Sequence, residues 1–184
     1  MNYCSDCGEQ VEQRVPDGDN RHRYVCTHCN TIHYQNPRII AGTVPVWDNR
    51  ILLCRRAIEP RYGYWTLPAG FMENQETTIE AAARETREEA LAEVHIEGLY
   101  AVIDVPHIDQ VHIFYRATLI DGEYGAGEES LETQLFELSD IPWDELSFPT
   151  VRKTLELFVN DMKQQTFGVH VDSIRHSMAK SEKA

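Results

Sequence analysis

Three glutamates in the segment 70–92 have the residue type and the spacing to bind a divalent metal ion. Glu85, Glu88 and Glu89 stand at positions i, i+3 and i+4, so a helix would place all three carboxylates on one face. Carboxylates this close repel one another unless a positive group lies between them. Because hard divalent cations prefer carboxylate oxygen, the spacing favours a metal site. The alternative is a solvated helix face in an acidic protein.

The flanking residues indicate the helix that would carry these carboxylates. Thr77 and Glu80 form a T-x-x-E capping box, which marks a helix start. At 100° per residue, a narrow apolar stripe is predicted roughly opposite the carboxylates. The stripe consists of Ile79, Ala83, Thr86 and Ala90.

The whole segment, GFMENQETTIEAAARETREEALA, resembles the Nudix box, G-x5-E-x7-R-E-U-x-E-E-x-G-U, where U is an apolar residue. The matching positions are Gly70, Glu76, Arg84, Glu85, Glu88 and Glu89. Two positions depart from the pattern: Thr86 replaces an apolar residue, and Leu91 stands where the family has its second glycine. A glycine there usually lets the helix end in a left-handed conformation. Leu91 therefore predicts a slightly longer helix or a different exit from it.

The resemblance implies roles for the box residues. Mg²⁺ or Mn²⁺ would be held by the carboxylates of Glu85, Glu88 and Glu89, with the Ala69 carbonyl as a further ligand. Arg84 would hold Glu85 in orientation. Glu76 would support the loop and the metal from outside the ligand set.

A later loop supplies candidates for the general base. In this superfamily the base is a box glutamate or a glutamate from a later loop, and GEESLE offers Glu128, Glu129 and Glu132. We favour Glu129, then Glu132, as the base. The alternative is that all three are ordinary loop charges.

Four residues before the box are candidates for substrate contacts. Arg55 and Arg56 alternate on a predicted strand and therefore point to opposite faces. One of the two could reach a phosphate, while the other would be structural. Tyr64 and Trp65 could stack on adenine or flavin, although aromatic residues in such loops more often belong to the core.

The N-terminal segment carries two CxxC pairs separated by 18 residues. The pairs consist of Cys4, Cys7, Cys26 and Cys29. This spacing is typical of a structural Cys₄ zinc site, and a segment too short for its own core needs such a staple. Two disulfides or a redox CxxC are the alternatives. His28 and His33 are spare candidates that we assign to the surface, because four thiolates already complete a tetrahedral site.

Composition and charge limit the classes of partner. The 184-residue chain has a net charge of −13, and neither its first 36 residues nor the rest offers a basic nucleic-acid surface. A phosphorylated substrate would need cations at the site to offset the acidic field. No run of 18 apolar residues and no signal peptide are found, so we expect no membrane partner. The acidic charge leads us to expect no nucleic-acid partner either. Five cysteines without an export signal predict a reducing, cytoplasmic location.

Alternation of strand-like and helix-like segments predicts an α/β fold of two units and a tail. We expect a zinc ribbon over residues 1–36, a catalytic domain over 37–166 and a polar tail over 167–184. The expected strands include 51–56, 94–106, 111–120 and 131–138, and a helix is expected over 149–163. The resemblance implies the Nudix α/β/α sandwich with a mixed sheet, preceded by the small ribbon.

Beyond the box, the chain is similar to zinc-ribbon Nudix enzymes that hydrolyse FAD and ADP-ribose. This resemblance rests on CSDCG, CTHCNTIHYQNP, YWTLPAGFME and GEESLETQLFELSDIPWDELSF. The NADH-cleaving group carries an SQPWPFP-like stretch after its box, and here GLYAVIDVPHIDQVH follows instead. We therefore expect hydrolysis of the diphosphate bridge of FAD or ADP-ribose, in a homodimer by analogy. The alternatives are an NADH diphosphatase or a catalytically silent nucleotide-binding protein.

Overall fold

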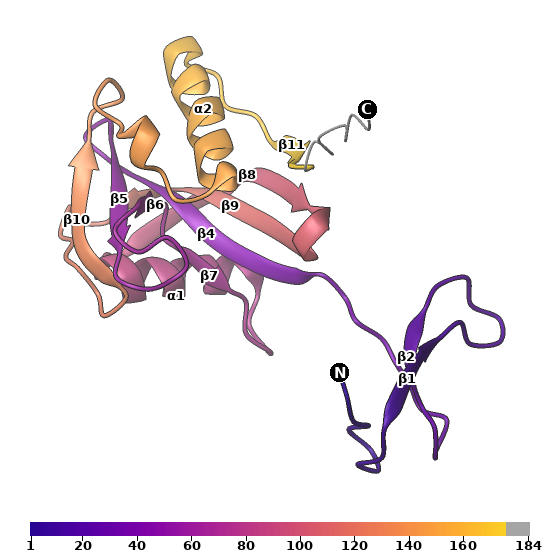
Figure 1. Ribbon diagram of the computed structural model, residues 1–184. Coiled ribbons are helices and arrows are strands. Elements are labelled where there is room, and N and C mark those ends of the chain that lie inside the picture. The colour runs from indigo at the N-terminus through magenta and orange to yellow at the C-terminus, as the bar shows by residue number, and fades with distance from the viewer. Residues whose placement is uncertain (176–184) are drawn as a thin grey trace, which may run out of the picture. The chain divides into compact units, whose positions relative to one another are not determined.

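The computed structural model describes residues 1–175 (Figure 1). The chain divides into two compact units, with the boundary between Pro37 and Arg38. Within the described residues, no helix is long and apolar enough to cross a membrane. Each unit has its own sheet and its own chemistry.

The N-terminal unit is a three-stranded antiparallel sheet in the order β1-β2-β3. Its strands are β1 (Val11–Arg14), β2 (Arg23–Cys26) and β3 (Ile32–His33). Strand β2 ends at Cys26, the first cysteine of the second CxxC pair. The sheet is too small to bury a core of its own, and Val25, Cys4 and Cys26 are the buried hydrophobic side chains of this unit.

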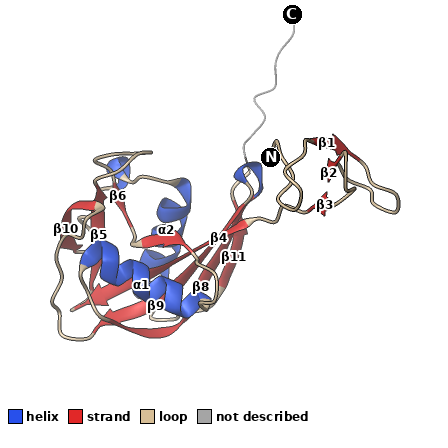
Figure 2. Cartoon of the chain, turned by 90° about the horizontal axis from the view of Figure 1, so that it is seen from below, coloured by secondary structure: helices blue, strands red, loops and turns tan. Residues whose placement is uncertain are grey.

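The second unit is an eight-stranded mixed sheet between two helices, and this confirms the predicted sandwich (Figures 1 and 2). The strands are β4 (Arg38–Trp47), β5 (Arg50–Arg56), β6 (Trp65–Thr66), β7 (Ala69–Phe71), β8 (Val94–Val105), β9 (Gln110–Leu119), β10 (Ser130–Phe136) and β11 (His170–Ser173). The main path runs β10-β5-β4-β9-β8-β11. Parallel pairing joins β4 to β9 and β11 to β8, and the other pairs are antiparallel. Short 3₁₀ turns occupy Pro106–Ile108 and Trp143–Glu145.

The two helices, α1 (Thr78–Ala90) and α2 (Pro149–Gln164), cover opposite faces of this sheet (Figure 1). Strand alternation decides which side chains they meet. Ala41 and Tyr115 pack with α1, whereas Val44 and Phe114 pack with α2 in the main core. The expected helix over 149–163 is α2, and it buries one apolar stripe, in which Val151, Leu155 and Phe158 are buried and Met162 packs against them.

The helix α1 differs from its prediction in two details. Its capping box is present, with Thr77 accepting from the Glu80 N–H at 3.2 Å and Glu80 accepting from the Thr77 N–H at 2.7 Å. The predicted apolar stripe is partly wrong, because Ile79 is 48% exposed while Ala81, Ala82, Thr86, Glu89 and Ala90 are buried. The buried face consists mainly of small residues, and it lies close to β4: Thr86 Oγ1 is 2.7 Å from Thr43 Oγ1 of that strand.

The helix end is the second difference. Helix α1 stops at Ala90, and Leu91 itself takes the left-handed conformation at φ 47°. The helix is therefore not extended, and a leucine occupies the backbone position that a glycine usually fills.

Strands β4 and β5 diverge soon after their hairpin. They pair only at Val46–Ile51 and Trp47–Arg50. Beyond that point β7 pairs with β4 and β6 pairs with β5. This divergence opens the middle of the sheet between its two helices.

The last described strand lies beyond the predicted end of the catalytic domain. Strand β11, which our prediction placed in the tail, pairs in parallel with β8. His170 contacts the buried Asp161 of α2 at 2.7 Å, and Lys153 of α2 contacts Asp172 at 2.7 Å. Residues 170–174 therefore belong to the fold of the second unit.

Candidate active site

A cavity of about 1130 Å³ lies in the second unit, where β4 and β5 diverge. Its lining joins the C-terminal half of α1, the loop before β10 and the first turn of α2. Carboxylates dominate one part, and apolar side chains such as Ile40, Phe114 and Ile174 line another. Such a mixture of converging polar groups and apolar walls is typical of ligand sites.

The three predicted metal-binding glutamates all line this cavity. Glu89 is only 6% exposed, and its Oε2 accepts the Ala69 N–H at 3.0 Å. Burial raises the pKa of Glu89 to about 8, and burial also raises the pKa of Glu85. Buried carboxylates at elevated pKa become fully ionised when a cation compensates them. The oxygen donors of Glu85, Glu88 and Glu89 are of the type that Mg²⁺ or Mn²⁺ prefers. Among the described residues these three carboxylates do not converge as a close ligand group, and Arg84 is bonded to Glu85 and Glu88.

Arg84 lies among four acceptors of the box. Its guanidinium donates to Glu76 at 2.7 and 3.0 Å, to Glu85 at 2.7 Å and to Glu88 at 3.1 Å. It also donates to the Phe71 carbonyl at 3.2 Å. These hydrogen bonds lower the pKa of Glu76 to about 2 and raise the pKa of Arg84. The arrangement supports the predicted positioning role of Arg84 and keeps Glu76 ionised.

Strand β7, which precedes α1, is packed tightly against the Glu85 carboxylate. A Cβ added to Gly70 would lie 2.4 Å from the carboxyl atoms of Glu85. Glycine at this position therefore leaves the space that the Glu85 carboxylate occupies. Ala69 lines the cavity, and its N–H donates to Glu89; the assignment of its carbonyl to a metal stays a prediction.

The loop before β10 closes over the C-terminal end of α1. Gly125 donates to the Ala90 carbonyl at 2.8 Å, and Gly127 donates to the Glu89 carbonyl at 3.1 Å. These bonds satisfy free carbonyls at the helix end and bring Glu128 and Glu129 to the cavity.

Glu132, our second choice for the base, does not line the cavity. Its carboxylate pairs with Arg55 at 2.8 Å. The bulge in β10 between Ser130 and Glu132 separates it from Glu129. Of the two favoured glutamates, Glu129 is the one at the site.

The two adjacent arginines face different surroundings, as their alternation predicts. Arg56 lines the cavity, donates to the Pro60 carbonyl at 3.0 Å and lies 5.2 Å from the ring centroid of Phe148. Arg55 is instead bound to Glu132 and to the Gly63 carbonyl at 2.9 Å. Arg56 is therefore the member of the pair that could meet a phosphate.

The predicted aromatic contacts are not at the cavity. Trp65 is buried in the core with its ring 4.9 Å from that of Phe136, as the alternative interpretation expected. Tyr64 lies outside the lining, 5.2 Å from the Arg61 guanidinium. Strand β6 pairs with β5 at this point and turns Trp65 inward.

Several lining residues were missed by sequence reasoning. They are Phe71, His112, Phe148, Thr150 and Ile174. Burial lowers the pKa of His112 to about 4, so its ring is neutral near pH 7. The alternation of β9 could have placed His112 and Phe114 on one face, but nothing in the sequence places Ile174 beside the box.

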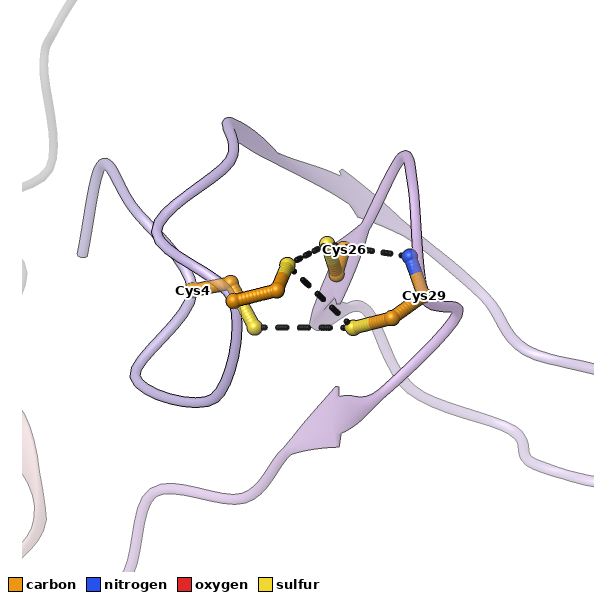
Figure 3. Close-up of side chains that lie close together, drawn as sticks. Cys4, Cys26 and Cys29 are labelled. Carbon is orange, nitrogen blue, oxygen red and sulfur yellow. Dashed lines mark hydrogen bonds between the residues drawn. The ribbon is translucent and has the colours of Figure 1, made fainter.

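The ribbon brings its four cysteines together (Figure 3). The sulfurs of Cys4 and Cys29 lie 3.7 Å apart, and Cys7 lies 3.5 Å from both Cys26 and Cys29. These separations exclude disulfides and approach the edge of about 3.8 Å expected for a tetrahedral zinc–thiolate site. Among the described residues, this cluster is the group of four ligand atoms within 4.8 Å of one another.

We expected His33 to be a surface residue, but it is half-buried and contacts the cysteine cluster. Its Nε2 lies 3.3 Å from the Cys4 sulfur. An imidazole in this position can hydrogen-bond a metal-bound thiolate and orient it. The hydroxyl of Thr31 lies 3.2 Å from the Cys29 sulfur and could act in the same way.

These features define a class of protein: an α/β/α enzyme domain with a carboxylate-rich cavity, preceded in the sequence by a four-cysteine ribbon. Sequence models of two families match the chain: the Nudix N-terminal zinc ribbon over residues 2–35 and the NUDIX domain over residues 36–158. The chain therefore belongs to the Nudix hydrolase family and carries the family's zinc ribbon.

Individual relatives support this assignment. The structure of a NUDIX hydrolase from Nitrosomonas europaea superposes with a TM-score of 0.92 at 48% identity, covering 95% of this chain and 99% of that one. An ADP-ribose pyrophosphatase of Methanocaldococcus jannaschii is 33% identical over 113 residues, which are 59% of this chain and 67% of that protein. The NAD-capped RNA hydrolase NudC of Vibrio atlanticus is 30% identical over 89% of this chain, and the match spans only 60% of NudC.

Proposed function

We propose that the protein hydrolyses the diphosphate bridge of ADP-ribose and FAD, giving AMP together with ribose 5-phosphate or FMN. The observation that carries this proposal is a single cavity that joins the box carboxylates to Arg56 and to apolar side chains. A dinucleotide has the matching order of groups, with a diphosphate between two larger, partly apolar ends. The name of the Methanocaldococcus jannaschii relative supports ADP-ribose as one substrate.

The chain's own residues would perform distinct parts of the reaction. Mg²⁺ or Mn²⁺ bound at Glu85, Glu88 and Glu89 would polarise the phosphoryl oxygens and lower the pKa of a bound water. Arg84 would offset the repulsion between the carboxylates of Glu85 and Glu88 and hold both in a fixed orientation. Arg56, at the end of β5, would contact the diphosphate.

We assign the general base to Glu129, with a box glutamate as the alternative. Glu129 lines the cavity on a loop that is hydrogen-bonded to the end of α1. A general base must come within hydrogen-bond reach of the attacking water. A glutamate on a loop can move into that position when substrate binds. Glu132 is a weaker choice because Arg55 already holds it.

A second candidate function is hydrolysis of NADH or of the NAD cap of an RNA. It is favoured by the similarity to NudC proteins of several bacteria, of which the match spans 50 to 60%. Against it stand the missing SQPWPFP-like stretch and the acidic ribbon, which holds three arginines against five acidic residues.

Initial rates on a substrate panel test the proposal. ADP-ribose, FAD, NADH and an NAD-capped RNA would each be assayed with Mg²⁺ and with Mn²⁺, and kcat/KM compared. We expect ADP-ribose and FAD to lead and NADH to be clearly slower. A preference for NADH of about tenfold, equal to about 1.4 kcal/mol in the transition state, would overturn the assignment.

We further expect a cytoplasmic homodimer. This rests on analogy with small Nudix domains rather than on a contact in the chain. Light scattering at micromolar concentration measures the mass, and a monomer would contradict the expectation.

A further inference from the structure

We propose that Arg56 and the first turn of α2 form an anion-binding subsite for the substrate phosphate that the metal ion does not hold. This inference rests on the proposed function, because it assigns the second half of the diphosphate to named groups. The subsite lies in the same cavity as the box, at the other side of the gap between β4 and β5.

The start of α2 leaves backbone donors free. Its N-cap residue is Phe148, and no side chain caps this end. Pro149 has no N–H, while the Arg152 N–H already donates to the Phe148 carbonyl at 3.1 Å. Among the described residues, the N–H groups of Thr150 and Val151 therefore lack an acceptor. All four residues from Phe148 to Val151 line the cavity, and a 16-residue helix adds the positive end of its dipole.

The side chain of Thr150 is an independent sign of a missing ligand. It is 3% exposed, lines the cavity, and its hydroxyl has no hydrogen-bond partner in the described structure. Buried hydroxyls are nearly always paired with protein, water or ligand. Thr154, one turn later, follows this rule, since its hydroxyl donates to the Thr150 carbonyl at 2.8 Å. The Ser147 hydroxyl is also buried without a partner, but only Thr150 of the two lines the cavity, so the Thr150 hydroxyl is the one whose unused donor a ligand in the cavity could engage.

Arg56 is held in place beside this helix start. The Pro60 carbonyl accepts its Nε–H at 3.0 Å, and its guanidinium stacks 5.2 Å from the centroid of the Phe148 ring. Its two terminal Nη groups have no acceptor among the residues described. A guanidinium fixed through Nε with both Nη groups free is suited to binding two phosphate oxygens at once.

The charges of the cavity favour a phosphate at this position. Two arginines line the described cavity, and Arg84 is already bound to Glu76, Glu85 and Glu88. Arg56 and the helix start are therefore the positive groups that remain for an anion.

Paired ligands with and without a phosphate test this subsite. The pairs are AMP with adenosine and ribose 5-phosphate with ribose, titrated calorimetrically into the full chain at low ionic strength without added divalent cation. The proteins compared are wild type, Thr150→Val, Arg56→Gln and the matched control Thr154→Val. No turnover is needed, so the result stands even if the protein hydrolyses none of the dinucleotides in the panel.

In at least one pair, we expect the phosphorylated ligand to bind the wild type more tightly. Thr150→Val should weaken that ligand about tenfold and Arg56→Gln at least as much, while binding of the unphosphorylated partner stays unchanged. Thr150→Val should not lower the melting temperature, because the hydroxyl has no internal partner, whereas Thr154→Val should lower it and leave the phosphate effect intact. The inference is overturned if the wild type shows no phosphate preference in either pair, or if Thr150→Val affects both members of a pair equally.

Discussion

The amide N–H of Ala69 donates to Oε2 of Glu89 at 3.0 Å, and this bond joins β7 to the last turn of α1. It holds a carboxylate that is 6% exposed in a fixed direction before any cation is present. Chain segments twenty residues apart are thereby brought together at the carboxylate end of the cavity. Fixing a ligand in advance reduces the cost of organising the site during the reaction.

The first prediction concerns Glu89. Replacement by Gln removes one negative charge but little volume, and one amide oxygen can still accept the Ala69 N–H. We expect kcat to fall by at least about a hundredfold with little change in melting temperature. Glu93→Gln is the control, since Glu93 is exposed and pairs with Arg87 at the surface. An active Glu89→Gln variant at low Mg²⁺ would remove this face from the metal site.

The second prediction tests the space beside Gly70. A Cβ there would lie 2.4 Å from the carboxyl atoms of Glu85, so Gly70→Ala should displace that carboxylate. We expect kcat to fall about tenfold or more. Gly98→Ala is the matched control, because a Cβ at Gly98 meets no atom within 4 Å. Equal activity of the two variants would show that the position of Glu85 is unimportant.

The third prediction concerns the end of α1. Leu91 adopts φ 47°, a conformation that costs a leucine energy and a glycine almost none. Leu91→Gly should therefore stabilise the protein by up to about 1 kcal/mol, measured as a rise in melting temperature. Leu91→Ala shortens the side chain but keeps the strain, so a similar gain in that variant would contradict this explanation.

The fourth prediction is a pH dependence of stability from His112. Burial lowers its folded pKa to about 4, against about 6.5 in an unfolded chain. Between these values the unfolded state binds a proton that the folded state does not. The contribution of His112 to the free energy of unfolding is therefore complete above pH 6.5 and is lost as pH falls toward 4, by at most about 3 kcal/mol. The raised pKa of Glu89 contributes the opposite slope, so the two contributions partly cancel in the wild type.

Urea unfolding of the wild type and of His112→Gln at pH 7 and pH 5 isolates the His112 contribution, because Glu89 is present in both proteins. All three tryptophans, Trp47, Trp65 and Trp143, lie in the second unit, so their fluorescence reports on its unfolding. His112→Gln should reduce the loss at pH 5, while His95→Gln at an exposed position should not. An unchanged slope in His112→Gln would assign the pH dependence to other groups.

The fifth prediction concerns the ribbon. Elemental analysis of protein purified without added metal should give one zinc per chain, bound by Cys4, Cys7, Cys26 and Cys29. Cys26→Ser should lose most of that zinc. Four sulfurs found in disulfides, or no tightly bound metal, would show that the cluster has another purpose.

The sequence by itself determined the local features of this protein. The capping box at Thr77 and Glu80 set the start of α1, and the i, i+3, i+4 spacing put the three carboxylates on adjacent turns. The CxxC spacing identified the ribbon for a similar reason. For the helix and for each single CxxC pair, the information lies within a few residues, where helix or knuckle geometry fixes the relative positions of side chains.

The tertiary structure decided what meets the box across the cavity. Arg56 rather than Arg55 lines it, Trp65 belongs to the core, and Thr150 and Ile174 arrive from segments far along the chain. These outcomes depend on where β4 and β5 separate and on how β11 adds to the sheet beside β8. Pairing between distant strands selects one register among many, and that choice depends on packing of the whole core rather than on local spacing.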